Sequence, residues 1–191
     1  MELLSARLIS KRFRDTHTLA NDRISISLAE GETRAVVGEN GAGKSTFARA
    51  IAGLLVPDSG ELFVRGKRVR AGSVREAEAA GIGFVPQSSL LAAGLTIAEN
   101  IVLGREPKSM GFFLSRRKAY VETALLVERF GFRLDPEALV SSLSAAERRQ
   151  AEIARALARG GDILILDEPT SILSESESER LFQLLDRLAK A

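Results

Sequence analysis

Cysteine is absent from the 191-residue sequence. Its absence excludes a disulfide scaffold, a cysteine-ligated zinc site and thiol catalysis, and it agrees with a reducing compartment. An excess of one charge is also lacking, because 27 lysine and arginine residues face 25 aspartate and glutamate residues. The overall field of the protein therefore gives no reason to expect nucleic acid or an acidic membrane as a partner.

Long apolar runs are missing as well. No run reaches the roughly 18 residues that a membrane-spanning helix needs, and the N-terminal residues lack the basic-then-apolar order of a signal peptide. Any membrane contact is therefore expected to come through a partner. What is present is a balance of 45% hydrophobic and 27% charged residues, typical of a soluble globular protein, in a length that suits one domain.

The first half of the sequence carries both strand and helix signals. Apolar and polar residues alternate from residue 2 to residue 28, which predicts strands. Residues 34–37 predict a brief buried strand that leads into a glycine-rich loop and a helix. Ser73 and Glu76 have capping-box spacing, which predicts a short helix ahead of a strand over residues 82–86.

The region from about residue 88 to residue 160 carries helix signals and no strand signals. Capping patterns recur there at Thr96 with Glu99, Asp135 with Pro136, and Ser144 with Glu147. A continuous apolar run over residues 163–166 then predicts a parallel strand covered on both faces, and leucines at helical spacing predict an amphipathic final helix. Strands before and after a helical block imply that the block is an insertion.

The glycine-rich loop is the strongest functional signal. Residues 38–45 match the pattern G-x-x-x-x-G-K-[ST] between a predicted strand and a predicted helix. In this pattern the backbone wraps a phosphate, the lysine reaches the β and γ phosphates, and the hydroxyl residue ligates Mg²⁺. The predicted nucleotide-binding residues, which include a catalytic lysine and a metal-binding serine, are Gly38, Glu39, Asn40, Gly41, Ala42, Gly43, Lys44, Ser45 and Thr46.

Two carboxylates follow the later apolar run. Asp167 and Glu168 come at the carboxyl end of the predicted strand, where open α/β sheets place their ligands. Taken alone, such a pair also fits a solvated turn. Coupled to the phosphate loop, Asp167 is predicted to hold Mg²⁺ or its water, and Glu168 to act as general base on the attacking water.

Together these signals predict an α/β fold. We expect a P-loop NTPase core with a mixed or parallel sheet, an N-terminal antiparallel β part and an inserted α-helical subdomain. Within a single domain, residues 1–87 and 161–191 are expected to form the ATP-binding core, and residues from approximately 88 to 160 the helical subdomain.

By these motifs the chain resembles the ATP-binding subunits of ABC transporters, and the likeness runs from about residue 10 to the end. Gln87 matches the Q-loop glutamine, which the family uses in catalysis and at Mg²⁺ or its water, although a glutamine after a strand also fits a surface position. Phe13 matches the aromatic residue that stacks on adenine, although it also fits a core position. The resemblance implies that ATP and Mg²⁺ are bound and ATP is hydrolysed.

The segment that matches the family's LSGGQ signature departs from it. Ser144 is followed by Ala145 and Ala146 where two glycines are usual. In the family this helix start contacts the ATP bound by the opposite protomer, and here the extra methyl groups are expected to restrict that approach. The same residues fit a Ser-x-x-Glu capping box, which alone would explain them as a helix start. At the place of the D-loop acid stands Ser174.

A switch histidine on a strand after the final helix is usual in the family. The one histidine here, His17, lies before the phosphate loop and fits an exposed turn. The resemblance therefore implies that the C-terminal end of the domain is missing and that the isolated chain hydrolyses ATP slowly or not at all.

Phrases such as GENGAGKST and LTIAENIVLG look most like the simple-sugar and nucleoside uptake branch, in which two ATPase halves are often fused and this chain would be the first. The resemblance implies a second ABC ATPase domain and transmembrane permease subunits as partners, no direct nucleic acid, and a peripheral place on the cytoplasmic face of the cell membrane. The assembly of two ATPase domains and the permease would transport a solute such as a sugar in or out, and ATP-driven dimerisation would power this transport.

Three alternatives stay open at this point. A GTPase or other P-loop switch would carry an Asn-Lys-x-Asp guanine reader, which the sequence lacks. A soluble ABC protein acting on nucleic acid or ribosomes is suggested by basic clusters at residues 65–70 and 116–118, which also fit solvated faces. A noncatalytic, regulatory nucleotide-binding half is suggested by the two alanines of the signature segment.

Overall fold

An antiparallel sheet forms the N-terminal part of the protein. The computed structural model describes residues 2–105, 108–109 and 113–190. The long strands β1 (Glu2–Phe13) and β2 (Thr18–Ala29) form a hairpin, and β3 (Ser59–Val64) and β4 (Lys67–Val69) complete the sheet in the order β2-β1-β3-β4. The predicted strands between residues 2 and 28 are therefore confirmed.

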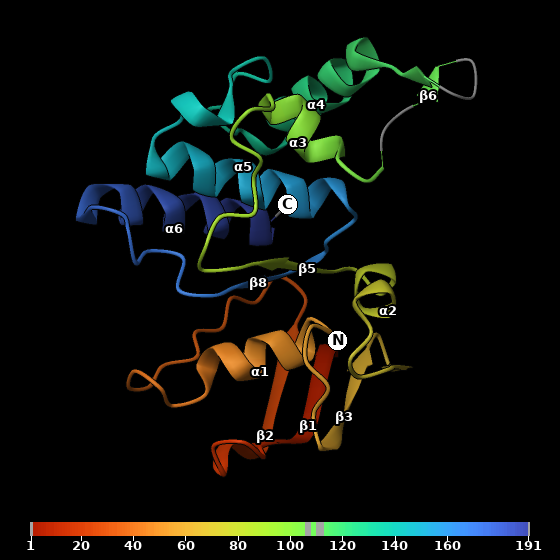
Figure 1. Cartoon of the computed structure of the whole chain (residues 1–191), viewed down its shortest axis with the longest axis vertical. Coiled ribbons are helices and arrows are strands. Elements are labelled where there is room, and N and C mark those ends of the chain that lie inside the picture. The colour runs from red at the N-terminus through yellow and green to blue at the C-terminus, as the bar shows by residue number, and fades with distance from the viewer. Residues whose placement is uncertain (1, 106–107, 110–112, 191) are drawn as a thin grey trace.

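A parallel pair of strands lies in the middle of the molecule (Figure 1). β5 (Ile82–Val85) pairs with β8 (Ile163–Leu166) in register, so that Ile82 faces Ile163. The two strands are far apart in the sequence, and the segment between them contains the helical block. This arrangement confirms the α/β fold with an antiparallel part and a helical insertion.

Six helices surround these sheets in the described part of the chain. α1 (Lys44–Ile51) lies between the antiparallel sheet and the parallel pair, and α2 (Val74–Ala79) precedes β5 (Figure 1). α5 (Ala145–Ala158) and α6 (Glu175–Lys190) lie over the opposite side of the pair, beneath α3 (Ile97–Val102) and α4 (Arg116–Phe130). A 3-10 turn, Val140–Ser142, precedes α5.

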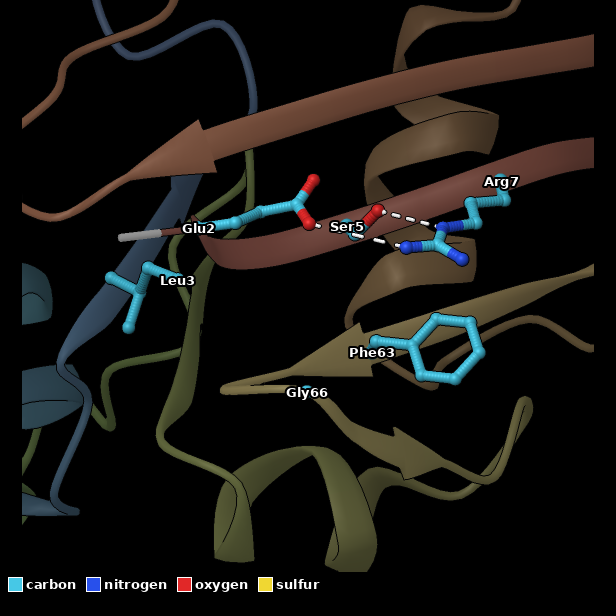
Figure 2. Close-up of a pocket in the computed structure, with 6 residues that line it drawn as sticks. All are labelled: Glu2, Leu3, Ser5, Arg7, Phe63 and Gly66. Carbon is cyan, nitrogen blue, oxygen red and sulfur yellow. Dashed lines mark hydrogen bonds and ion pairs between the residues drawn. The ribbon is translucent and has the colours of Figure 1, made fainter.

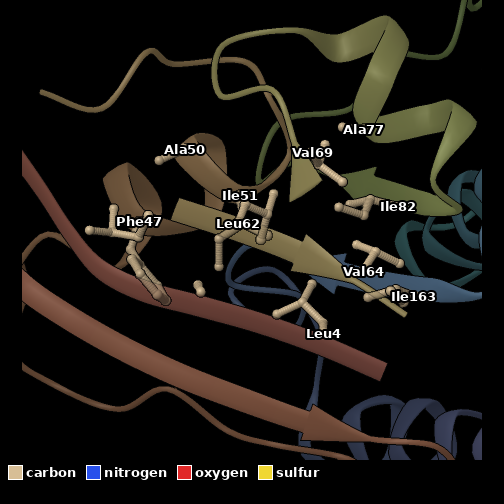
Figure 3. Packing of buried hydrophobic residues seen from close by; sticks show 12 residues of the cluster. Leu4, Phe47, Ala50, Ile51, Leu62, Val64, Val69, Ala77, Ile82 and Ile163 are labelled. Carbon is tan, nitrogen blue, oxygen red and sulfur yellow. The ribbon is translucent and has the colours of Figure 1, made fainter. Parts of the chain in front are cut away.

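The parallel pair separates two hydrophobic cores. In the first core, Phe47 and Ile51 of α1 pack with Leu4 and Leu62 of the antiparallel sheet, and the cluster also contains Ile82 of β5 and Ile163 of β8 (Figure 3). The second core includes buried residues of β5, α3, α5 and α6: Val85, Ile97, Ile101, Ile153, Leu181 and Leu184. Because both cores use the same two strands, this pair fixes the helices relative to the antiparallel sheet.

The helix starts follow the sequence signals closely. The side chain of Thr96 accepts from the Glu99 amide at the start of α3, and the full capping box is present. Ser73 accepts a hydrogen bond from the Glu76 amide in the same way at the start of α2. Each such cap satisfies an amide that would otherwise lack a partner, which contributes about 1 kcal/mol.

Three sequence expectations were wrong. Residues 34–37 form no strand, and Val37 is 87% exposed, because the segment runs over the surface rather than beside β8. Asp135 was expected to cap a helix, but it caps only a turn. Its side chain accepts from the Glu137 amide and its carbonyl accepts from the Ala138 amide. The helical block also contains a two-strand hairpin, β6 (Lys108–Ser109) with β7 (Phe113–Leu114).

No helix within the described ranges is both long and apolar enough to cross a membrane.

Candidate nucleotide and catalytic site

The start of α1 is held open rather than capped. Gly43 occupies the N-cap position at φ 89°, in the left-handed region, and no side chain caps the helix. A Cβ at Gly43 would lie 2.0 Å from the carbonyl oxygen of Ala20, so only glycine fits between the loop and β2. The first amides of α1 therefore remain available to an anion, and the helix dipole favours negative charge there.

Lys44 lies across the mouth of the glycine-rich loop. Its Nζ donates to the carbonyl oxygens of Gly38 and Glu39, both at 2.8 Å. An ammonium has three donors, so these two bonds leave one for a ligand. The loop is exposed, and Lys44 stands at the first helical position, beside the open amides. This geometry concentrates positive charge where a phosphate would lie.

Ser45 and Asp167 come together from distant parts of the chain. The Oγ of Ser45 donates to Oδ1 of Asp167 at 2.7 Å. Asp167 is only 4% exposed, and its Oδ2 is buried without a hydrogen-bond partner. A buried carboxylate oxygen without a partner is costly unless a cation or donor completes it. A hydroxyl and a carboxylate side by side are oxygen ligands of the kind that Mg²⁺ binds, so these residues fit the ion.

Glu168 is held in an unusual backbone conformation at the end of the parallel pair. Its φ is 45°, which is rare for a residue other than glycine and costs of order 1 kcal/mol or more. The Nε2 of Gln87 donates to its Oε2 at 2.6 Å, and the Ser171 amide donates to its carbonyl at 3.3 Å. The structure therefore brings the predicted Q-loop glutamine and the predicted general base into direct contact.

A cavity of about 250 Å³ lies against these groups. Its lining residues come from the end of the β1–β2 hairpin, the phosphate loop, α1 and the segment after β8: Phe13, Thr16, Thr18, Ala20, Gly41, Gly43, Lys44, Ser45, Thr46 and Glu168. Phe13 is half-buried and lines the cavity, with Lys11 Nζ 5.9 Å from its ring centre. The hairpin end thus supplies an aromatic wall beside the phosphate loop.

The start of α5 is organised differently. Ser144 caps it, and its Oγ donates to Glu147 Oε2 at 2.7 Å while Glu147 also accepts from the Ser144 amide at 2.8 Å. These two hydrogen bonds lower the pKa of the Glu147 carboxyl. Ser144, Ala145 and Ala146 are not among the residues that line the cavity. The structure thus confirms the capping box and leaves the predicted contact with ATP untested.

A second cavity, of about 190 Å³, lies elsewhere on the antiparallel sheet (Figure 2). The guanidinium of Arg7 lies over the Phe63 ring, 4.8 Å from its centre. Its Nε donates to the Oγ of Ser5, and its Nη2 forms an ion pair with Glu2 at 4.0 Å. The charge in this cavity is already paired within the protein.

Two residues of the site region gave no signal in the sequence analysis. Asn21 is buried, and its Nδ2 donates to the carbonyl of Gly43 at 3.1 Å, which steadies the loop from behind. Arg149 is buried on α5 and donates to the backbone beside Gln87. Both act through backbone carbonyls of distant segments, which no spacing rule in the sequence reveals. The remaining predicted loop residues, Asn40 and Ala42, lie in the same exposed turn as Gly41.

Comparison with known proteins agrees with this geometry. Residues 21–171 match the family model described as ABC transporter. The chain is 42% identical over 172 residues to the guanosine import ATP-binding protein NupO of Bacillus subtilis (strain 168), covering 90% of this chain and 34% of that protein. It is 43% identical over 183 residues to a putative ribose/galactose/methyl galactoside import ATP-binding protein of Agrobacterium fabrum, covering 96% and 35%.

The fold is shared with solved structures. An ATP-binding cassette of an ABC transporter in its ADP conformation superposes with a TM-score of 0.85 at 25% identity, covering 100% of this chain and 78% of that one. The chain spans about a third of the length of the two curated relatives. The family match covers most of the described residues and includes the phosphate loop, Gln87 and Asp167. The chain therefore belongs to the ABC transporter family.

Proposed function

We propose that this chain binds ATP with Mg²⁺ in the cavity at the start of α1 and takes part in ATP hydrolysis. The observation that carries the proposal is the uncapped start of α1 at Gly43, which faces the same cavity as Lys44 and Glu168. The names of both curated relatives describe ATP-binding proteins, which supports a nucleotide at this site. Within the domain, we propose that residues 1–87 and 161–191 form the ATP-binding core and residues from about 88 to 160 the helical subdomain.

Each group of the site has a role that its geometry permits. The amides at the start of α1 and the Lys44 ammonium bind the β and γ phosphates of ATP. Ser45 and Asp167 would hold Mg²⁺, which would offset the negative charge of the phosphate oxygens when bound. Glu168 accepts a proton from the attacking water, and the Gln87 amide, 2.6 Å from its carboxylate, fixes the direction of that carboxylate.

The base of the nucleotide has a place at the hairpin end. Phe13, at the end of β1, lines the same cavity as Lys44. Stacking of a base on an aromatic ring is worth roughly 1–3 kcal/mol. Adenine against Phe13 would leave the triphosphate directed toward Lys44.

The transport assembly extends this proposal. We propose that two such domains, as a homodimer or as fused halves, close head to tail over two ATP molecules, with the Ser144 segment of one facing the phosphate loop of the other. Transmembrane permease subunits, which would hold these domains at the cytoplasmic face of the membrane, would couple closure to uptake of a simple sugar or nucleoside. The named substrates of the relatives, guanosine and ribose or galactose, support this class of solute.

Calorimetric titration with MgATP tests nucleotide binding. We expect Lys44→Ala to weaken binding by roughly a hundredfold, about 2.7 kcal/mol, because the ammonium that neutralises the phosphates is lost. Lys67→Ala is the matched control, since Lys67 is exposed on β4 and does not line the cavity. Equal affinity of Lys44→Ala and the wild-type chain would refute the proposed site.

A nucleotide sensor without turnover is the second candidate, and the two alanines at positions 145 and 146 favour it. Under the ATPase proposal, Ser144 still meets ATP across the dimer but with weakened phosphate contact. Restoring both glycines by Ala145→Gly and Ala146→Gly is then expected to raise turnover in a complete assembly, and Glu168→Gln to abolish it while binding persists. If the wild type and the variant with both glycines restored bind nucleotide but neither hydrolyses it, the sensor is favoured.

A further inference from the structure

Arg149 is a buried cation in the described part of the helical block. It lies on the second turn of α5, its side chain is 3% exposed, and Nη1 is 2.8 Å from Oε2 of Glu152, which is 7% exposed. The Nε of Arg149 and Oε1 of Glu152 are buried without hydrogen-bond partners. Removing two charges from water costs more than one such contact returns, so a buried pair is weak evidence for a role in stability.

The guanidinium of Arg149 also donates hydrogen bonds to the loop that follows β5. Its Nη1 donates to the carbonyl of Pro86 at 2.8 Å, and its Nη2 donates to the carbonyl of Gln87 at 3.4 Å. Further along α5, Arg155 donates to the carbonyl of Leu90 at 3.2 Å. α5 therefore holds both ends of the segment 86–90, and the planar fork of Arg149 holds the end that carries Gln87.

The direction of Gln87 depends on this backbone. Gln87 is exposed and belongs to no helix or strand, yet its Nε2 lies 2.6 Å from the carboxylate of Glu168. A loop side chain keeps one direction only when the backbone that carries it is fixed, and the carbonyls bound by Arg149 belong to Gln87 itself and to the residue before it. The contacts connect α5 to the general base in three steps.

We infer that Arg149 is a positioning residue: it fixes the backbone of Pro86 and Gln87 so that the Gln87 amide stays on the Glu168 carboxylate, and Glu152 neutralises it for that purpose. The consequence for turnover rests on the proposed function, whereas the effect on Gln87 does not. Because Ser144 begins the same helix, a displacement of α5 would also displace Gln87.

Replacing the ion pair by apolar residues separates positioning from stability. In Arg149→Met with Glu152→Leu both buried charges are removed together, so we expect the chain to stay folded. Arg149→Lys is a second variant, which keeps the charge opposite Glu152 but loses the fork that reaches two carbonyls. Arg148→Met is the control, because Arg148 is the exposed neighbour of Arg149 on α5.

The readout is the side-chain amide signal of Gln87 in ¹⁵N-labelled, nucleotide-free chain, identified by its loss in Gln87→Ala. In the wild type and in Arg148→Met, the further substitution Glu168→Gln is expected to shift this signal, because the two side chains are in contact. In the double variant and in Arg149→Lys that shift is expected to disappear. An undiminished shift in either folded variant would overturn the inference, whether or not the chain binds nucleotide.

Kinetics in an assembly that turns over ATP give a second, independent measure. We expect the double variant to lower kcat by roughly ten- to a hundredfold with KM changed less than about threefold, because the phosphate loop is untouched and only the catalytic geometry is lost. In a Gln87→Ala background the same substitutions are expected to have no further effect. Additive losses in kcat would contradict positioning through Gln87.

Discussion

Two helix starts in this protein solve the same problem in opposite ways. At α5, the Ser144 hydroxyl and the Glu147 carboxylate satisfy each other and the local amides. At α1, Gly43 stands at the N-cap with no side-chain cap, although the same kinds of orphan amide are present. Amides at a helix start that have no cap and lie beside a cavity can bind an anion. Amides that are already capped stabilise the helix instead.

The difference in capping between α1 and α5 has a cause in the sequence. A serine and a glutamate three residues apart can cap a helix by themselves, and the loop before α1 offers glycines instead. Gly43 has no side chain to cap the helix, but for the same reason it allows the backbone to pass within contact distance of Ala20 in β2. The phosphate loop thus depends on packing against the antiparallel sheet, and the signature segment depends on its own side chains.

The largest expected effect breaks the start of α1. Gly43→Ala places a Cβ 2.0 Å from the Ala20 carbonyl and forces alanine into the left-handed region. We expect a loss of about 3 kcal/mol or more in the free energy of unfolding, together with loss of MgATP binding. Gly41→Ala is the control, because Gly41 is also left-handed but its Cβ would meet nothing within 4 Å. Urea titration should give it a loss of only about 1 kcal/mol, and equal losses would refute the packing argument.

A smaller effect is expected at the start of α5. Ser144→Ala removes a cap, so the free energy of unfolding should fall by about 1 kcal/mol, measured by urea titration. Binding of MgATP to the isolated chain should not change, since Ser144 does not line the cavity. A change in affinity of more than about threefold in the isolated chain would show that the two helix starts are less separate than the structure indicates.

The smallest expected effect is a dependence on pH. The Ser144 amide and hydroxyl lower the pKa of Glu147 below its ordinary value of 4.5. A group with a lowered pKa in the folded state contributes stability that is present above the unfolded value and is lost as the pH falls through the folded one. Unfolding midpoints from about pH 6 to about pH 3 should therefore fall less steeply in Glu147→Gln than in the wild type. Parallel curves would show that this capping contact is absent in solution.

Local chemistry in the sequence was enough to predict much of the site. The loop pattern from Gly38 to Ser45 predicts a phosphate ligand. Asp167, predicted at the end of an apolar run, lies with its Oδ1 2.7 Å from the Oγ of Ser45, which fits a shared role in holding a metal ion. The contact between Gln87 and Glu168 was not predicted: the family resemblance indicated Gln87 and the position after the apolar run indicated Glu168, and only the structure brings the two side chains to 2.6 Å. The loop pattern can be recognised because its residues stand at a fixed spacing within one short segment.

Long-range packing could not be read in the same way. Residues 34–37, an arginine followed by three apolar residues, suggest a strand. A strand forms only if a neighbour pairs with it, and here β8 pairs with β5 alone among the described residues. Asp135 and Pro136 have the types of a helix start, yet the chain turns toward α3, where the Pro136 carbonyl accepts from Ala98. The burial of Arg149 could not be predicted, because arginine side chains are mostly exposed.

The shared strand pair also sets the order of events by which the chain acquires its structure. Ile82 and Ile163 meet only when distant segments close a long loop, and the entropy of that closure is lost before any contact between the two strands compensates for it. The β1–β2 hairpin and the capped helices, by contrast, need only neighbours in the sequence. Pairing of β5 with β8 should therefore be the slow step of folding, and the Ser45–Asp167 contact cannot form before it.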